Sequence, residues 1–336
     1  MATPAAPPTL EMVAAVAGVS RSTVSRVVNS SPSVAPAVLA AVNAAIDQLG
    51  YVPNRAARSL ASHRTRTIAL VIPEDTAKFF ADPYYAAVVP GVAQYLSTTD
   101  YTLTLLIASE GDEDKTRRYL LSGNVDGALI LSHQTKDRLY VQLAHSLPIV
   151  FGGHPTGIDA PDIHIVDIDN TAAAAKATSV LLDHGRRRLA TIAGPQTIAS
   201  AIDRLAGWRQ TVTAASLSDD LVEYADWSAS AGADAMHRLL DRGVPIDGLF
   251  AASAQIAFGA LGVLHERGIE VPGQVAITTI DNDQYAQTST PALTTIEQPT
   301  AIQGSTIAAT LLRLIEGEEI DHLTLMPTTL IERGSV

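Results

Sequence analysis

Apolar runs that alternate with helical segments from residue 67 onward constrain the fold of this 336-residue chain more than any other feature. Continuous apolar runs are typical of parallel strands buried on both faces. The runs are Thr67–Ile72, Leu103–Ile107, Val125–Leu131, Ile149–Phe151, Ile163–Ile168, Leu189–Ile192, Leu249–Ala251, Val275–Ile280 and, last, Leu323–Ile331. Helical segments between them include Ala86–Leu96, Asp114–Leu121, Ala172–Leu182, Ala229–Leu240 and Ala257–Glu266. Because these units are too many for one ordinary sheet, the pattern predicts an α/β body of two lobes, each a parallel sheet with helices on both faces.

The stretch Val19–Asn29 has a different pattern, with valines spaced three and four residues apart. This spacing predicts a short helix with one apolar face. The opposite face carries only hydrogen-bonding groups: Arg21, Ser22, Ser25, Arg26 and Asn29. Ser20 is expected to cap the helix by accepting from the backbone N–H of Ser22 or Thr23. A solvated surface helix would show the same two faces.

An earlier apolar-faced helix, Leu10–Ala17, is expected to be capped by Thr9 and joined to this helix through Gly18. Two short helices with a glycine-containing turn predict a helix-turn-helix, whose second helix reads the major groove of DNA. A third helix should begin at Pro36 and end at Gly50. Asn54 is expected to cap a short fourth helix that is too small to fold alone.

Charge is distributed unevenly along the chain. The whole chain carries a net charge of −12, which by itself argues against a nucleic-acid partner. Residues 1–66, however, hold six arginines and only two acidic residues. A small basic head on an acidic body is expected where only the head contacts phosphates, although chance clustering would give the same asymmetry.

Other classes of protein find little support in the sequence. The chain has no cysteine, and its histidines lack the spacing of metal ligands, so no metal is expected. Nucleotide-binding and hydrolase motifs are absent, so neither an enzyme, catalytic residues nor a cofactor is predicted. No apolar run is long enough to span a membrane and no secretory signal is present, which favours a cytoplasmic, nucleoid-associated protein.

Ordered motifs along the chain resemble those of the LacI/GalR family of transcription regulators. In the head they are Ala17-Gly18-Val19-Ser20, Thr23-Val24-Ser25-Arg26-Val27, Leu49-Gly50-Tyr51-Val52-Pro53-Asn54 and Ala57-Arg58-Ser59-Leu60-Ala61. In the body they are Asp126-Gly127, Asp169-Asn170, His184-Gly185-Arg186-Arg187, Ala193-Gly194-Pro195, Arg204-Leu205-Ala206-Gly207-Trp208 and Pro291-Ala292-Leu293-Thr294-Thr295-Ile296. The resemblance implies a body like that of a periplasmic binding protein, a homodimer and a near-palindromic double-stranded DNA operator.

The resemblance also implies the domain organisation. Residues 1–8 would be a disordered tail, 9–53 the DNA-binding domain, 54–66 a hinge helix with a linker and 67–336 the ligand-binding and dimerisation domain. The N-terminal lobe would comprise about 67–168 and 298–325, and the C-terminal lobe about 169–297 and 326–336. The chain would cross between them three times, near Asp167–Asn170, Glu297–Pro299 and Met326–Pro327.

Arg21, Ser22 and Arg26 occupy the positions where family members contact bases, and the arginine fork suits guanine. The remaining predicted DNA-binding residues are Ser20, Thr23, Ser25, Asn29, Tyr51, Asn54, Arg55, Ala57, Arg58 and Leu60. Leu60 would wedge a base step from the minor groove, unless it packs on its own body. The third helix departs from the family at Ala35, Val38, Leu39 and Ala41, which removes capping and phosphate-binding groups.

A cleft between the lobes, at the carboxyl ends of the strands, is where such a body binds a small molecule. The predicted effector-binding residues are Tyr84, Tyr85, Arg204, Trp227, Ser253, Asp281 and Gln298. An aromatic face, an arginine fork and a carboxylate together grip a polyhydroxyl ring, which favours a sugar or sugar derivative. Either tyrosine could instead pack inside its lobe, Trp227 could fill the core, and Arg204 and Asp281 could be surface charges.

Ser253-Ala254 replaces the family's Asn-Asp, and Gly152-Gly153 replaces a usual acidic residue, which predicts a roomier pocket or a ligand with fewer hydroxyls. His133 and His154 could fill the gaps left in the pocket, but an isolated histidine is usually a polar surface or loop residue, and neither is placed in the predicted site. The predicted function is a DNA-binding regulator, a repressor, controlled by a carbohydrate-like effector. The alternatives are a sugar-binding protein of the same body fold with weak or lost DNA binding, and a transport-type binding protein, which would need a signal peptide and no helix-turn-helix.

Overall fold

The computed structural model describes residues 8–28, 33–52, 64–108, 113–131, 138–155 and 162–336. The chain forms two compact units, a head within residues 1–66 and a body from residue 67 to residue 336. The head contains α1 (Leu10–Ala17), α2 (Arg21–Val28) and α3 (Pro36–Leu49). The predicted hinge helix lies outside the described residues.

The helix-turn-helix and its caps are confirmed. Thr9 accepts a hydrogen bond from the Met12 N–H, and Ser20 accepts one from the Thr23 N–H at 3.1 Å. Gly18 adopts a left-handed φ of 68°, which a residue without Cβ reaches at little cost, and this φ ends α1. Val24 and Val27 of α2 are buried against α1 and α3. The apolar face of α2 therefore holds the helix in place and leaves its polar face outward.

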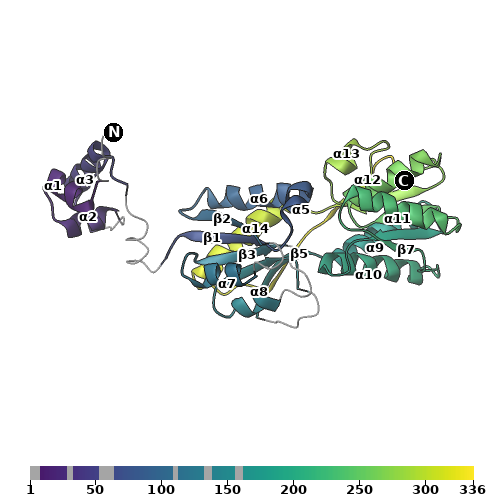
Figure 1. Cartoon of the computed structure of the whole chain (residues 1–336), viewed down its shortest axis with the longest axis horizontal. Helices are drawn as coiled ribbons and strands as arrows, with labels where there is room; N and C mark the ends of the chain where they lie inside the picture. The colour runs from purple at the N-terminus through teal and green to yellow at the C-terminus, as the bar shows by residue number, and fades with distance from the viewer. Residues whose placement is uncertain (1–7, 29–32, 53–63, 109–112, 132–137, 156–161) are drawn as a thin grey trace. The chain divides into compact units, whose positions relative to one another are not determined.

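The body consists of two sheets, each with six strands in the described residues (Figure 1). We call the lobe containing the first sheet the first lobe and the other the second lobe. The strand order of the first sheet is β11-β5-β4-β3-β1-β2, and all its pairs are parallel. Its strands are β1 (Thr67–Ile72), β2 (Thr102–Ile107), β3 (Gly127–Leu131), β4 (Ile149–Gly152), β5 (His164–Ile168) and β11 (Leu323–Met326). The helices of this lobe are α5 (Thr76–Ala81), α6 (Pro83–Leu96), α7 (Glu113–Leu121), α8 (Arg138–Leu143) and α14 (Thr300–Ile315).

The second sheet has the order β12-β10-β9-β8-β6-β7. Its strands are β6 (Leu189–Ala193), β7 (Val222–Tyr224), β8 (Gly248–Ala251), β9 (Ala276–Ile280), β10 (Thr294–Glu297) and β12 (Thr329–Ile331). The helices of this lobe are α9 (Asn170–Asp183), α10 (Ala199–Ala214), α11 (Ala229–Asp241), α12 (Ala254–Glu266) and α13 (Gln284–Thr288). Apolar clusters fill both faces of each sheet.

Two features differ from the sequence-based expectation. The run Leu323–Ile331 is not one strand, because β11 ends at Met326 in the first sheet and β12 starts at Thr329 in the second. The second sheet is also not wholly parallel, since β12 pairs antiparallel with β10. β10 leads out of the second lobe toward α14 of the first, whereas β12 enters the second lobe from β11 of the first, so these two neighbouring strands run in opposite directions.

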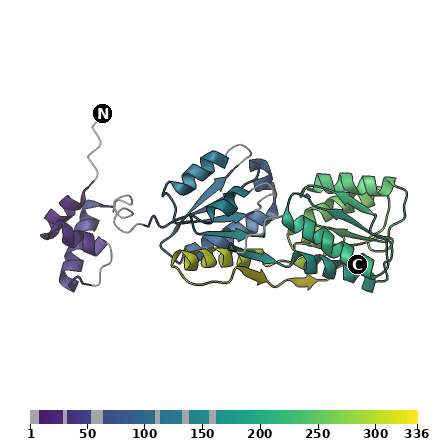
Figure 2. The same cartoon turned by 90° about the horizontal axis from the view of Figure 1, so that it is seen from below.

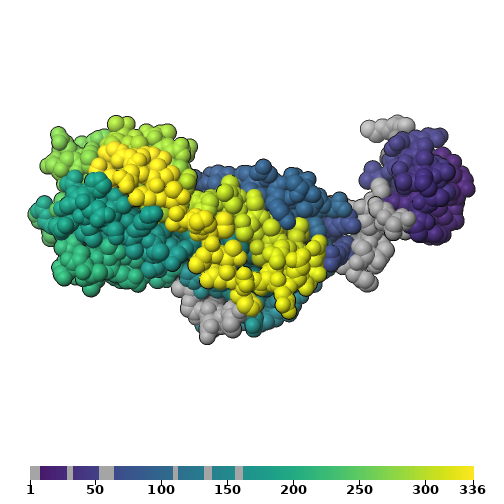
Figure 3. Space-filling view, turned by 180° about the vertical axis from the view of Figure 1, so that it is seen from behind, coloured from purple at the N-terminus to yellow at the C-terminus, as the bar shows by residue number. Residues whose placement is uncertain are grey.

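The chain passes between the lobes at three places: from β5 to α9, from β10 to α14 and from β11 to β12. Figure 2 shows the C-terminal segment, in yellow, running from the first lobe into the second. Figure 3 shows C-terminal residues on the surface of both lobes. These crossings bring the carboxyl ends of strands from both sheets to the same region of the body, where the predicted ligand site lies.

Candidate functional site

The polar face of α2 presents three exposed side chains, those of Arg21, Ser22 and Arg26. The Arg21 Nε lies 3.1 Å from Glu11 Oε1 on α1, an ion pair in which both side chains are more than half exposed. The Arg26 Nε donates to the Ser22 carbonyl oxygen at 3.4 Å. In each arginine the Nε is thus already bonded to another group of the head. An arginine fork can still present its terminal nitrogens to a base edge.

Other predicted DNA-binding residues have structural contacts. The Ser20 hydroxyl, besides capping α2, lies 2.8 Å from the Ser22 hydroxyl and 2.9 Å from that of Thr23. Tyr51 is buried in the core of the head, where packing alone accounts for an aromatic ring. Ser25 is half-buried. The remaining ones, Asn29, Asn54, Arg55, Ala57, Arg58 and Leu60, lie outside the described residues.

The start of α3 has the departures expected from the sequence. Ala35 occupies the N-cap position and provides no side-chain hydrogen bond. Leu39 is 43% exposed on the helix. The first turn of α3 therefore offers neither a capping hydroxyl nor a cation to a nearby phosphate.

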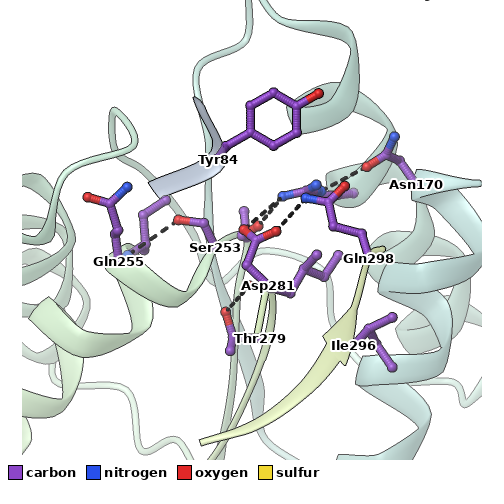
Figure 4. A network of polar contacts seen from close by, with 12 residues as sticks. Tyr84, Asn170, Ser253, Gln255, Thr279, Asp281, Ile296 and Gln298 are labelled. Atoms are coloured by element: carbon purple, nitrogen blue, oxygen red, sulfur yellow. Dashed lines mark hydrogen bonds and ion pairs between the residues drawn. The ribbon is translucent and has the colours of Figure 1, made fainter. Parts of the chain in front are cut away.

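In the body, an open cleft lies between the two lobes. Six of the seven predicted effector-binding residues line it: Tyr84, Tyr85, Arg204, Trp227, Asp281 and Gln298. The seventh, Ser253, is not in the lining. Its hydroxyl caps α12 by accepting from the Ile256 N–H at 3.4 Å, and the residue is buried. Figure 4 shows Asn170, Asp281 and Gln298 gathered around one polar network, with the Tyr84 ring on another segment above it.

Arg204 is the best-anchored cation of the cleft. It is only 5% exposed, and its Nε donates to Asn170 Oδ1 at 2.9 Å while Nη1 donates to the Ala252 carbonyl oxygen at 2.7 Å. Asp281 Oδ2 lies 3.9 Å from Nη1, and the guanidinium stands 5.7 Å from the centre of the Trp227 ring. These contacts fix the guanidinium in one orientation. A preorganised fork of this kind binds vicinal hydroxyls with little loss of side-chain entropy.

Asp281 directly follows β9 and has a φ of 82°, a left-handed conformation that costs a non-glycine residue about 1–2 kcal/mol. Its backbone is held by two bonds: its N–H donates to the Ile296 carbonyl oxygen at 3.0 Å, and its own carbonyl accepts from the Thr295 hydroxyl at 2.8 Å. The Gln298 amide donates to its carboxylate. The sheet thus stabilises a strained conformation that turns the carboxylate into the cleft.

The two tyrosines have different roles. Tyr85 is buried in the core of the first lobe, where its ring packs against Phe79. The Tyr84 hydroxyl lies 3.4 Å from Gln303 Oε1 within the cleft lining. Burial raises the pKa of Tyr84 far above its usual range, and the carboxylate of Asp167 raises it further. Tyr84 therefore stays a neutral hydroxyl that can donate to or accept from a ligand.

Sequence reasoning missed several polar residues of the cleft: Asp82, His154, Asp167, Asn170 and Gln303. Burial raises the pKa of Asp82 to about 6, and the nearby Asp281 also raises it. Asp82 accepts from the Tyr84 N–H at 2.9 Å and from Gln255, on the second lobe, at 3.5 Å. His154, one of the two histidines that the sequence offered as gap fillers but did not place in the site, lies in the lining. A polar residue near the end of a predicted strand, such as Asp167 in β5, could have been identified from the sequence as a residue of the cleft.

A second hollow adjoins the cleft. The two share Asp82, Tyr85, Ile198 and Trp227 in their linings. The Trp227 indole therefore stands where the two spaces meet. It packs against Gly194, at which a built Cβ would lie 2.5 Å from Trp227 Cη2. A side chain at position 194 would have to displace the indole, because an aromatic ring cannot bend away.

If Trp227 stacks on the effector as the sequence predicts, Gly194→Ala should weaken effector binding by about 3- to 30-fold, because the displaced ring would lose that contact. Isothermal titration calorimetry measures the change. The matched control is Gly262→Ala on α12, where a Cβ meets no atom within 4 Å. The control should leave affinity unchanged and raise stability by up to about 1 kcal/mol. Equal affinities for both variants would contradict the role of Gly194.

A helix-turn-helix head joined to a two-lobed body with a polar, aromatic-lined cleft defines the class of ligand-responsive DNA-binding proteins. The comparisons with known proteins agree with this class. Residues 9–54 match the family of bacterial regulatory proteins described as the lacI family, and residues 178–336 match a periplasmic binding protein-like domain.

Among curated proteins, the chain is 43% identical over 326 residues to the HTH-type transcriptional regulator CelR of Thermobifida fusca, covering 96% of each chain. It is 33% identical to the ribose operon repressor of Escherichia coli (strain K12), covering 97% of this chain and 99% of the repressor. Among solved structures, a CelR–cellobiose complex is 41% identical with a TM-score of 0.78, covering 98% of this chain and 100% of that one. A lac repressor dimer bound to operator and an anti-inducer is 26% identical with a TM-score of 0.88, covering 98% and 99%.

The chain belongs to the lacI family of bacterial regulatory proteins, and it is a DNA-binding transcription regulator of the helix-turn-helix type. The family is one of transcription regulators and not of enzymes. Within the described residues, no helix is long and apolar enough to cross a membrane.

Proposed function

We propose that this regulator is a repressor whose affinity for its operator is controlled by a β-linked glucose disaccharide of the cellobiose type, bound between the lobes. The observation that carries the proposal is the pair of adjoining hollows that share the Trp227 ring. One sugar ring would bond to Arg204 and Asp281, and the second would extend past Trp227. The CelR relative whose structure contains cellobiose supports this choice of ligand.

The head would bind DNA through the exposed face of α2, with Arg21, Ser22 and Arg26 at base edges. Ser20, Thr23, Ser25 and Asn29 would serve the phosphates and the cap. Two copies of the chain would bind a near-palindromic operator, an arrangement supported by the lac repressor relative, which is bound to its operator as a dimer. The hinge region, with Asn54, Arg55, Ala57, Arg58 and Leu60, would contact the minor groove, and the protein would act at the nucleoid.

A thermal-shift comparison tests the effector. Cellobiose, glucose and ribose are each added to the intact protein, and the unfolding temperature is measured against buffer. A ligand present at 100 times its Kd stabilises by about 2.7 kcal/mol, which raises the unfolding temperature of a body this size by several degrees. Cellobiose should do so at the lowest concentration. A shift with ribose and none with cellobiose would refute the proposed effector.

The altered α3 favours a second candidate, a body that still binds sugar while the head has lost its affinity for DNA. Ala35 provides no cap and Leu39 occupies an exposed position without charge. A gel shift with the DNA upstream of the protein's own gene distinguishes the two. Retarded DNA supports the regulator, and DNA that stays free at micromolar protein supports the second candidate.

The same substitutions predict a shallow salt dependence of operator binding. Each phosphate contact releases about one counterion, so fewer contacts reduce the slope of log affinity against log salt concentration. Leu39→Arg should steepen that slope by about 1. Fluorescence anisotropy over a salt series measures both slopes. A wild-type slope that corresponds to about eight or more released counterions would contradict the prediction.

A further inference from the structure

His154 lies between two carboxylates that belong to different lobes. It follows β4 in the first lobe, and its Nδ1 is 3.2 Å from Asp167 Oδ2 near the end of β5. Its Nε2 is 3.2 Å from Asp203 Oδ2 on α10 of the second lobe. The imidazole thus spans the gap between the lobes at the lining of the cleft.

From this geometry we infer that His154 is a positioning residue that clasps the two lobes together beside the ligand. The inference rests on the proposed function in so far as the cleft holds the effector. Asp203 directly precedes Arg204 on α10, so the clasp fixes the helix that carries the cleft's arginine. It thereby holds Arg204 opposite the ligand groups of the first lobe, such as Tyr84.

We call the contacts of His154 with Asp167 and Asp203 the clasp. The clasp requires a protonated imidazole ring. Two ring nitrogens can both donate to carboxylates only in the imidazolium form, whereas a neutral ring leaves one lone pair facing a carboxylate oxygen. The hydrogen bond to Asp167 raises the pKa of His154, burial opposes this, and the charges of Asp203 and Asp167 raise it further. The clasp is therefore complete at pH values below the ordinary histidine pKa and is lost as pH rises through the raised value.

Hydrogen bonds hold the Asp167 carboxylate in place, and several charges act on that of Asp203. Asp167 Oδ1 accepts from its neighbour Ile168 N–H at 2.7 Å and from Asn170 Nδ2 at 3.2 Å, which leaves Oδ2 directed at the histidine. Burial raises the pKa of Asp203, as do the charges of Asp167 and Asp169, while His154 and Arg204 lower it. These are the charged groups that face the clasp from β5, α9 and α10.

An NMR titration of His154 in the effector-free protein tests the contact between lobes. Asp203→Asn should lower the pKa of His154, because it removes a negative charge supplied by the other lobe. Asp219→Asn is the control, since that carboxylate pairs with Arg209 on the surface of the second lobe. A His154 titration that is unchanged by Asp203→Asn would overturn the clasp, whatever ligand the cleft binds.

A binding series then tests the consequence for the effector, with cellobiose as the probe at about pH 6 and about pH 8. We expect wild-type affinity to be about three- to tenfold tighter at the lower pH, and His154→Gln to show a smaller difference. Burial also raises the pKa values of Asp82 and Asp283 to about 6. Both residues are present in both proteins, so their contribution to the pH response is the same and cancels when the two responses are compared. The exposed His145→Gln should behave as wild type.

An equal pH response in wild type and His154→Gln would contradict the role of the clasp in binding. If cellobiose fails to bind wild type at either pH, the proposed effector is wrong, and the NMR titration still decides whether the clasp exists.

Discussion

Arg204→Ala is expected to abolish the response of this regulator to its effector. The variant removes a guanidinium that is almost fully buried and bonded to Asn170 and Ala252, and it leaves Asp281 without its cation. Hydrogen bonds to charged groups contribute about 1.5–3 kcal/mol each, so the loss of two ligand bonds should weaken cellobiose binding by at least about 100-fold. Calorimetric titration measures the affinity.

Stability changes must be separated from binding in this variant. Removing one partner of a buried polar network should lower the free energy of unfolding by about 2–3 kcal/mol, which thermal unfolding of each protein records. Arg204→Lys keeps the charge but loses the planar fork, and its affinity should fall between those of wild type and Arg204→Ala. Arg209→Ala, on the exposed part of the same helix, is the control. Unaltered effector-dependent DNA release in Arg204→Ala would show that the cleft is assigned incorrectly.

The double variant Arg21→Ala/Arg26→Ala is expected to lose operator specificity while the head stays folded. Each arginine that bonds to a base pair contributes about 1–3 kcal/mol of discrimination, so the two together should weaken specific binding by about 30-fold to more than about 1,000-fold. The fold should persist because the helix is held by Val24 and Val27 and both arginines are exposed.

The measurement is a comparison of affinity for the operator with affinity for a scrambled duplex of the same length. Arg209→Ala again serves as the control, since it removes one positive charge from the body and none from the head. A double variant that binds both duplexes more weakly but keeps the ratio of affinities would show that the two arginines contact phosphates only.

Local patterns predicted the lobes well because each strand is a short apolar run between helices. The strand Thr67–Ile72 has the predicted bounds, and the C-terminal run Leu323–Ile331 failed for a reason that lies in the tertiary structure. Its two halves pair with different sheets, and the break between them falls at the crossing predicted near Met326–Pro327. The strands β7 and β10 were also missed, because Glu223 in β7 and the threonines of β10 interrupt the apolar run that marked the other strands.

Side chains that the resemblance placed at the end of a strand or on a helix beside it, such as Asp281 and Arg204, do line the cleft. Contacts that depend on side chains of the other lobe were not predicted. His154 has no local pattern, and its two carboxylate partners are distant from it in sequence, one of them on another lobe. Ser253 was predicted to bind the effector but lies outside the cleft lining. Its hydroxyl, at the start of a helix, caps that helix instead.

The most direct test of the account is the affinity of the full-length protein for its own upstream DNA with and without cellobiose, measured by fluorescence anisotropy. We predict specific binding without the sugar and release of the DNA as cellobiose saturates the cleft, with a change in affinity of about 5- to 150-fold. Ribose at the same concentration should leave the DNA bound. An affinity for DNA that is identical with and without saturating cellobiose would contradict the account.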